Sequence, residues 1–156
     1  MKQIQIDDNY LVPVKSNCDG ELIFAGGGYE ERWYSVGEVQ MLMWEEVKAI
    51  RKYNRAFFEN NWIIFEKTDE YTPSQMYEVL GVSKYYASGD KFKDFDEVLA
   101  MKPKDISTYL QEMTDGYRQS LTAYVKGLVD NDDPRMDSKA KRNALEKVLN
   151  VDFSEV

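Results

Sequence analysis

The sequence predicts an α+β protein in which a small antiparallel β-meander with a short helix precedes a helical C-terminal half. Short apolar runs separated by glycine turns fill residues 1–43, a pattern typical of strands and hairpins. Apolar residues recur at helical spacing through much of residues 67–156. Hydrophobic residues make up 43% of the 156 residues. That share is well above the one found in disordered chains and is enough for a packed core.

Glycine-bounded apolar runs predict the meander, with four strands joined in chain order. The strands are expected at residues 10–14, 21–25, 32–36 and 38–43. Asp19-Gly20 predicts the first hairpin turn, and Gly26-Gly27-Gly28 predicts the second. Pro13 cannot donate to a ladder, so we expect the first strand to be an edge strand or to end there.

A short amphipathic helix is expected after the fourth strand. Val47, Ile50 and Tyr53 recur at helical spacing among charged residues. One asparagine of the pair Asn60-Asn61 is expected to end this helical segment in the left-handed conformation. Trp62-Ile63-Ile64-Phe65 is entirely apolar, so it predicts a buried strand that adds to the meander, with Trp62 in the core.

Capping signals mark the starts of the helices expected in the C-terminal half. These signals are Thr72-Pro73, Asp94 with Glu97, and Ser138. Gly81 ends the first of these helices. A single long helix is expected from residue 106 to residue 129. Its apolar face consists of Tyr109, Met113, Tyr117, Leu121, Tyr124 and Leu128.

The chain is expected to divide into two parts joined by a linker. We expect a β-rich domain at residues 1–84, a linker-like segment with a short helix at 85–104, and a helical subdomain at 105–156. Ser88-Gly89-Asp90 and Pro103 motivate the boundaries, because such residues are common in linkers. This organisation predicts loose coupling between the two halves and first proteolytic cleavage between residues 84 and 104.

The excess of acidic residues limits the classes of macromolecule that the chain is expected to bind. The 28 acidic and 20 basic residues give a net charge of −8 at pH 7, which disfavours duplex nucleic acid and anionic membranes. Cys18 is the only cysteine, so no intrachain disulfide can form, and a reducing compartment is expected. The first ten residues contain no apolar run, so no signal peptide is expected, and no stretch is long and apolar enough to span a bilayer.

The motifs that usually indicate catalysis fail in this chain. The sequence has no histidine, which removes the commonest general base and metal ligand. The Gly26-Gly27-Gly28 turn lacks the Gly-Lys-Ser/Thr that follows in a phosphate loop. The acidic run from Asp130 fails the calcium-loop spacing, because Arg135 is the sixth residue and Lys141 the twelfth. Cys18 has no basic neighbour to lower its pKa. We therefore expect a protein that is not an enzyme and binds no cofactor or metal.

Aromatic side chains are the candidate contacts for a protein partner. Trp33 and Tyr34 lie on opposite faces of an expected strand, so one of them is expected to be exposed. The apolar face of the long helix extends about 36 Å, against about 18 Å for the last helix that could cover it. We expect the surplus to contact another chain. The candidate partner-binding residues are Trp33, Tyr34, Tyr109, Met113, Tyr117 and Tyr124.

Two stretches of the sequence carry a resemblance to a known group of proteins. One is ERWYSVGEVQ at residues 31–40, followed by FFENNWII at 57–64, and the other is MDSK at 136–139, leading to ALEKVL at 144–149. Together they resemble small virion-associated proteins of tailed bacteriophages, most of which have no assigned role. The resemblance implies a role in the virion or in its assembly. Together with the absence of catalytic motifs, it leads us to expect a non-catalytic structural or adaptor protein that is made in the host cytoplasm and carried in the virion. It carries over no functional residues.

Two hypotheses about partners follow. In the first, the chain binds other virion subunits or a copy of itself through protein–protein contacts. In the alternative, the chain is an acidic phage-encoded inhibitor that masks a host protein with its negative surface. Exposed apolar strips favour the adaptor, and acidic residues gathered on one face favour the inhibitor.

Overall fold

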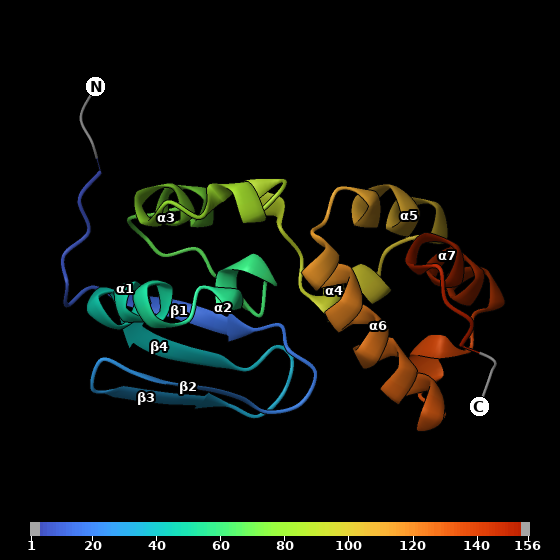
Figure 1. The fold of residues 1–156 in the computed structure, drawn as a ribbon. Helices are drawn as coiled ribbons and strands as arrows, with labels where there is room; N and C mark the ends of the chain where they lie inside the picture. Colours follow the sequence, from blue (N-terminus) through green and yellow to red (C-terminus); the bar gives the residue numbers. More distant parts are fainter. Residues whose placement is uncertain (1–3, 154–156) are drawn as a thin grey trace.

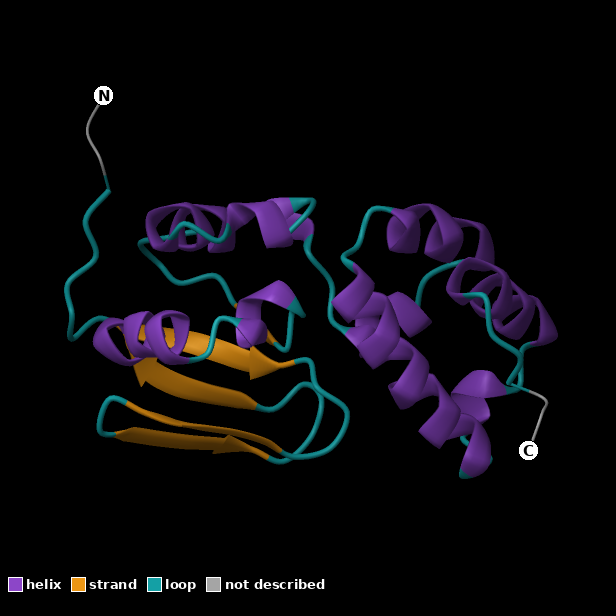
Figure 2. Cartoon of the chain, viewed as in Figure 1, coloured by secondary structure: helices purple, strands orange, loops and turns teal. Residues whose placement is uncertain are grey.

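Strands occupy the N-terminal part of the chain and helices the C-terminal part (Figure 1 and Figure 2). This computed structural model describes residues 4–153. The strands are β1 (Leu11–Ser16), β2 (Leu22–Gly26), β3 (Tyr29–Trp33), β4 (Val39–Met43) and β5 (Ile63–Phe65). The helices are α1 (Trp44–Tyr53), α2 (Ala56–Glu59), α3 (Pro73–Leu80), α4 (Phe95–Leu99), α5 (Pro103–Gln111), α6 (Asp115–Asp130) and α7 (Lys139–Leu149). Short 3₁₀ turns lie at Ser83–Tyr85, Gly89–Lys91 and Pro134–Met136. The predicted α+β class is confirmed.

The strands form two antiparallel sheets, and their pairing differs from the chain order of a meander. One sheet has the order β4-β1-β5, and the other is the β2–β3 hairpin. The expectation that Pro13 makes the first strand an edge strand or ends it is wrong, because β1 is the central strand and continues to Ser16. The expected Asp19-Gly20 turn therefore does not join two paired strands. The reason lies at Asn17, whose backbone N–H donates to Trp62 O at 2.7 Å, while its side-chain oxygen accepts the N–H of Phe95 at 2.9 Å. These bonds turn the chain away from β1 before a hairpin can close.

The second predicted turn is confirmed, because residues 27 and 28 connect β2 to β3. Gly27 and Gly28 have φ angles of 61° and 86°, the left-handed conformation that a two-residue hairpin turn requires. Leu22, Phe24 and Trp33 point from the hairpin into the core and are at most 6% exposed. The side chains that alternate with them face solvent or lie near the surface.

The segment between β4 and β5 contains two helices, not one. Asn54 ends α1, and the short α2 follows. Asn61 has a φ of 56°, so the expected left-handed asparagine is confirmed. All three residues of β5 are buried. Trp62 lies just before β5 and is half-buried, so the prediction that it belongs to the fully buried strand is wrong. Its indole N–H instead reaches Ser120 Oγ on α6 at 3.3 Å.

Two tyrosine hydroxyls occupy the outer edge of β5. The backbone N–H of Phe65 donates to Tyr77 Oη at 3.0 Å, and Tyr86 Oη donates to the carbonyl of Ile63 at 2.6 Å. The rings of Tyr77 and Tyr86 stack with centroids 3.9 Å apart. The edge strand thus gains hydrogen bonds without a neighbouring strand.

The predicted helix caps are confirmed. Thr72 forms a capping box with Gln75 at the start of α3, and Asp94 forms one with Glu97 at the start of α4. The Ser138 hydroxyl accepts the N–H of Lys141 at the start of α7. Each of these caps needs only side chains within three residues of the helix start.

The expected long helix from residue 106 to residue 129 is wrong, because α5 ends at Gln111 and α6 begins at Asp115. The Thr114 hydroxyl accepts the N–H of Tyr117 at 3.0 Å and so starts a new helix in the middle of the apolar stripe. Gly116 lets α6 approach the β-rich part closely. A Cβ at this position would lie 2.1 Å from the Asn60 side-chain oxygen and 2.8 Å from Asn60 Cα.

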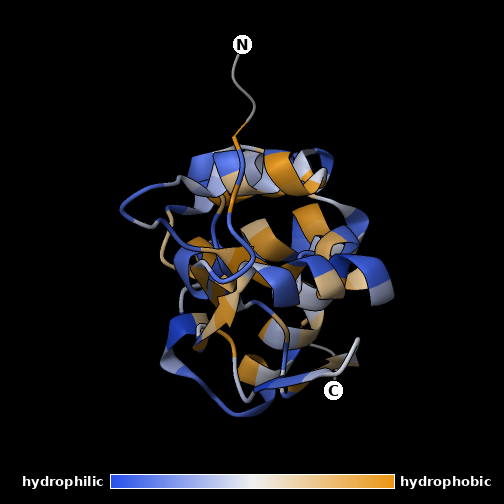
Figure 3. Cartoon of the chain, turned by 90° about the vertical axis from the view of Figure 1, so that its left-hand side faces the viewer, coloured by the Kyte–Doolittle hydropathy of each residue, from blue (hydrophilic) through white to orange (hydrophobic). Residues whose placement is uncertain are grey.

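The expected linker at 85–104 contains α4, and it contributes several buried side chains to one continuous core. These are Tyr86, Phe92, Phe95, Val98 and Leu99, none more than 7% exposed. In Figure 1, α4 and α6 lie where the helical part meets the strands. Hydrophobic segments gather toward the middle of the molecule in Figure 3, and hydrophilic ones lie at its periphery.

Two fully buried asparagines connect the strands to the helices across this junction. The Asn17 amide donates to Asn61 O at 3.3 Å, and the Asn61 amide donates to Tyr85 O at 2.7 Å. The Thr114 hydroxyl donates to the side-chain oxygen of Asn61 at 2.8 Å. Because buried amides need such partners, this network fixes the position of α6 relative to β1 and β5.

Candidate protein-binding surface

Three of the six candidate partner-binding residues lie in the core. Trp33 and Tyr117 are 0% exposed, and Met113 is 5% exposed. The Trp33 indole N–H donates to Val14 O at 3.0 Å, which satisfies the only polar atom of that side chain. In this fold, these three side chains offer no surface to a partner.

Tyr117 packs α6 against the segment that contains α4. Its ring makes edge-to-face contacts with Phe92 and Phe95, and its hydroxyl donates to Lys93 O at 2.8 Å. Burial raises the pKa of Tyr117 well above its ordinary value. Part of the apolar helix face that we expected to contact another chain therefore lies in the core. The break at Thr114 separates α5 from α6 and lets α6 turn toward the strands.

Tyr109 and Tyr124 are half-buried, and their hydroxyls are engaged within the chain. Tyr109 Oη accepts the N–H of Lys93 at 2.7 Å, and burial raises the pKa of Tyr109 to about 12. Tyr124 Oη donates to Asp96 at 2.5 Å, with the Arg135 guanidinium 5.9 Å from its ring centroid. Burial and the Asp96 hydrogen bond raise the pKa of Tyr124 to about 12. These two residues join α4, α5 and α6.

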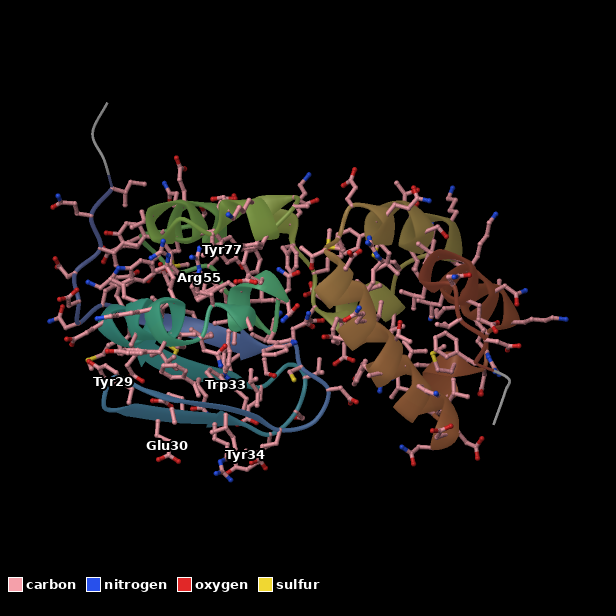
Figure 4. All side chains as sticks on the ribbon, viewed as in Figure 1. Tyr29, Glu30, Trp33, Tyr34, Arg55 and Tyr77 are labelled. Atoms are coloured by element: carbon pink, nitrogen blue, oxygen red, sulfur yellow. The ribbon has the colours of Figure 1, made fainter. Side chains whose placement is uncertain are left out.

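Tyr34 is the exposed member of the Trp33–Tyr34 pair, as strand alternation predicts. It is 62% exposed, and Figure 4 shows it at the outer surface below the hairpin. The Arg32 guanidinium lies 6.0 Å from its ring centroid. The backbone N–H of Tyr34 donates to the Glu38 carboxylate at 2.6 Å, which fixes the chain between β3 and β4.

A strip of apolar side chains covers the outer face of β1 and β4, and the sequence analysis did not identify it. The cross-strand register places Leu11 opposite Met43 and Pro13 opposite Met41. Met41 is 55% exposed, Leu11 53% and Val39 39%, while Pro13 and Met43 are half-buried. We call this set the β1–β4 strip. Its sequence signal is the alternation in VQMLM at 39–43, which contains no charged residue.

Lys15 lines a shallow pocket of about 570 Å³. A lysine in a pocket can act as a nucleophile only when its amine is uncharged. The Lys15 ammonium lies 2.8 Å from Asp94, 3.4 Å from Glu97 and 3.5 Å from Glu66. Burial alone would lower the pKa of Lys15, but the Asp94 hydrogen bond and the neighbouring carboxylates outweigh it and raise the pKa. A lysine held in the charged form is not a nucleophile. The ion pair instead joins β1 to the start of α4.

Cys18 is half-buried, and its thiol is not activated. Burial and the charge of Asp19 raise the pKa of Cys18 above its ordinary value, as the lack of a basic neighbour predicts. Within residues 4–153, no group of three or more Asp, Glu or Cys side chains is arranged to hold a metal ion. No helix in the same range is long and apolar enough to cross a membrane.

Glu46 on α1 is a buried acid, and one of its carboxylate oxygens has no hydrogen-bond partner within residues 4–153. It is 8% exposed, and the oxygen concerned is Oε2. The carboxyl of Glu31 on β3 lies within hydrogen-bonding reach. Burial, followed by the hydrogen bond and charge of Glu31, raises the pKa of Glu46 to about 7.

Comparisons of the chain with protein-family models, with curated proteins and with solved structures find no match.

Proposed function

We propose that the chain is a non-catalytic structural or adaptor protein of a tailed-phage particle, and that it acts by binding another virion subunit. The β1–β4 strip is the observation that supports this proposal. Single exposed apolar side chains are ordinary on a protein surface, but adjacent ones on a sheet face are typical of contact sites. The resemblance of residues 31–40, 57–64, 136–139 and 144–149 to virion-associated proteins supports the particle as the setting.

The chemistry of the strip fits an apolar protein partner. None of its five residues is charged, so docking a partner there removes no ion from water. Lys15, the next residue along this face of β1, already pairs with Asp94 and needs no partner charge. Leu11 and Met41 lie diagonally across the two strands, so a single partner side chain can contact both.

The test is whether the strip is required for incorporation into particles. Met41→Lys and Leu11→Lys place an ammonium in the proposed contact, where its burial is costly. Both side chains face solvent in the free protein, so we expect the circular dichroism spectrum and melting temperature to stay close to those of the parent. We expect at least about a tenfold loss of the chain from purified particles, measured by quantitative immunoblot, which corresponds to roughly 1.4 kcal/mol of binding free energy.

Val79→Lys is the matched control, because Val79 on α3 is 38% exposed and lies outside the strip. We expect this variant to enter particles like the parent. Normal incorporation of both strip variants would show that the strip is not the contact. Absence of the unmodified chain from purified particles would reject a virion role, and the inhibitor hypothesis would then be tested by binding to host proteins.

A further inference from the structure

Side chains, not a backbone ladder, attach the β2–β3 hairpin to the rest of the protein. β3 and β4 belong to different sheets. The Gln40 amide donates to Arg32 O at 3.0 Å, and the Trp33 indole N–H crosses to Val14 O. Few polar contacts of this kind hold the hairpin, so a change in one of them is expected to alter how firmly the hairpin is attached.

The Glu31–Glu46 pair is one of these attachments and joins β3 to α1. Glu46 is the third residue of α1, and its carboxylate lies near the backbone N–H of Met43 at the start of the helix. At this position the side chain lies close to the carboxyl of Glu31 on β3. Ionised carboxylates only accept hydrogen bonds, so the buried Oε2 of Glu46 lacks a donor unless the pair holds a proton.

No positive side chain offsets the charge of Glu46 within residues 4–153. β2 and β4 contain no titratable residue. The nearby titratable groups come from β3, from α1 and from the chain before β1, and they are Tyr29, Glu31, Glu45, Lys48 and Asp8. Among these, the Tyr29 hydroxyl bonds to Glu45, and the Lys48 ammonium pairs with Asp8.

We propose that the Glu31–Glu46 pair is a proton-dependent contact that holds the β2–β3 hairpin against α1 when one proton is shared and loosens the hairpin when both carboxylates ionise. When the pair ionises, two negative charges face each other across the β3–α1 contact, and Glu46 Oε2 remains buried without a donor.

The sign of the pH dependence follows from the direction of the pKa shift. The pKa of Glu46 is near its ordinary value in the unfolded chain and is raised to about 7 in the folded protein. Between these two values, the folded protein binds more protons than the unfolded chain does. The free energy of unfolding therefore falls as the pH rises through this window, and it levels off above about pH 7.

Hydrogen exchange of the hairpin amides tests the proposal directly. Exchange is measured by mass spectrometry at pH 6 and pH 8 and corrected for the intrinsic effect of pH. In the parent protein, we expect the protection factors of residues 22–33 to fall by about tenfold between the two pH values, the ratio that one pKa unit of linkage gives. Glu46→Gln keeps an acceptor near the Met43 N–H and supplies an amide donor toward Glu31. We expect its protection factors to change little with pH.

Glu30→Gln is the matched control on the same strand, since Glu30 is exposed and points outward from the hairpin in Figure 4. It removes the same charge and is expected to behave like the parent protein. The proposal is overturned if Glu46→Gln shows the parent's fall in protection, or if the parent shows no fall. An NMR titration in which the Glu46 carboxyl carbon has a midpoint near that of an ordinary glutamate would overturn it as well, whether or not the variants fold.

Discussion

Trp33 and Tyr34 are consecutive residues with opposite environments. Trp33 is the last residue of β3, and the side chain of Tyr34, which follows it, points to the other side of the chain. Trp33 points into the core from β3, where it fills the space between the hairpin and β1. Tyr34 is 62% exposed and contacts the guanidinium of Arg32. The sequence predicted that one of the two would be exposed, because side chains alternate along a strand. It could not say which, because that depends on where α1 packs against the hairpin.

The pair gives a prediction at the scale of single residues. Trp33→Ala removes a fully buried ring and the bond to Val14 O, so we expect it to lower the free energy of unfolding by about 3–5 kcal/mol. Tyr34→Ala removes a ring that lies mostly in water, and we expect a change within about 0.5 kcal/mol. Urea denaturation followed by circular dichroism measures both. Comparable losses in the two variants would contradict the assigned orientation of β3.

At the scale of elements, local signals were predictable and long-range ones were not. The caps at Thr72, Asp94 and Ser138 could be found because each involves residues within one turn. Thr114 was missed because the apolar spacing continues across it, so the periodicity alone does not distinguish one long helix from two. The order β4-β1-β5 was missed because it depends on contacts between segments far apart in the chain.

The candidate surface was predicted only in part for the same reason. Alternation predicted that either Trp33 or Tyr34 would be exposed, whereas the β1–β4 strip requires knowing that Leu11 and Met41 share a sheet face. Tyr117 was assigned to a partner contact because its true neighbours, Phe92 and Phe95, lie in the segment that was expected to be a linker. The sequence shows which side chains are apolar enough to be buried. It does not show whether they pack against another part of the same chain or against a partner.

Two glycines of α6 give a prediction at this scale. Gly116→Ala places a Cβ against the backbone of Asn60, so we expect a loss of about 1–3 kcal/mol in the free energy of unfolding. Gly127→Ala meets no atom within 4 Å, and we expect a gain of about 0.5–1 kcal/mol from helix propensity. Thermal or chemical denaturation of the two variants provides the comparison. A stabilising Gly116→Ala would mean that α6 does not approach Asn60 so closely.

At the scale of the whole molecule, the strands and the helices share a single core. The Asn17–Asn61 network, the Lys15–Asp94 ion pair and the hydrogen bond from Trp62 to Ser120 all link the β-rich part to the helices. A segment with linker-like composition can thus lie in the interior, because it buries the side chains of Tyr86, Phe92, Phe95, Val98 and Leu99. These contacts argue against the loose coupling that the composition of the segment had predicted.

Limited proteolysis tests the coupling. Trypsin can cleave after Lys84, Lys91, Lys93 and Lys104, but not after Lys102, because Pro103 follows it. Because the backbone around them is fixed by buried neighbours, we expect residues 84–104 to resist cleavage at least as long as the rest of the folded chain. The same digestion in denaturant is the control, in which these sites are expected to be cut readily. Early cleavage there in the native protein, identified by fragment mass, would restore the two-part organisation.

The tyrosine-bonded edge of β5 also bears on how copies of the chain can associate. An open strand edge is a template on which further backbones can add without limit, as in cross-β fibres. At β5, the amide of Phe65 and the carbonyl of Ile63 are already bonded to tyrosine hydroxyls from the same molecule. Growth of a fibre from this edge would first have to break those bonds and displace two stacked rings. Any assembly that leaves the fold intact must therefore form elsewhere on the surface.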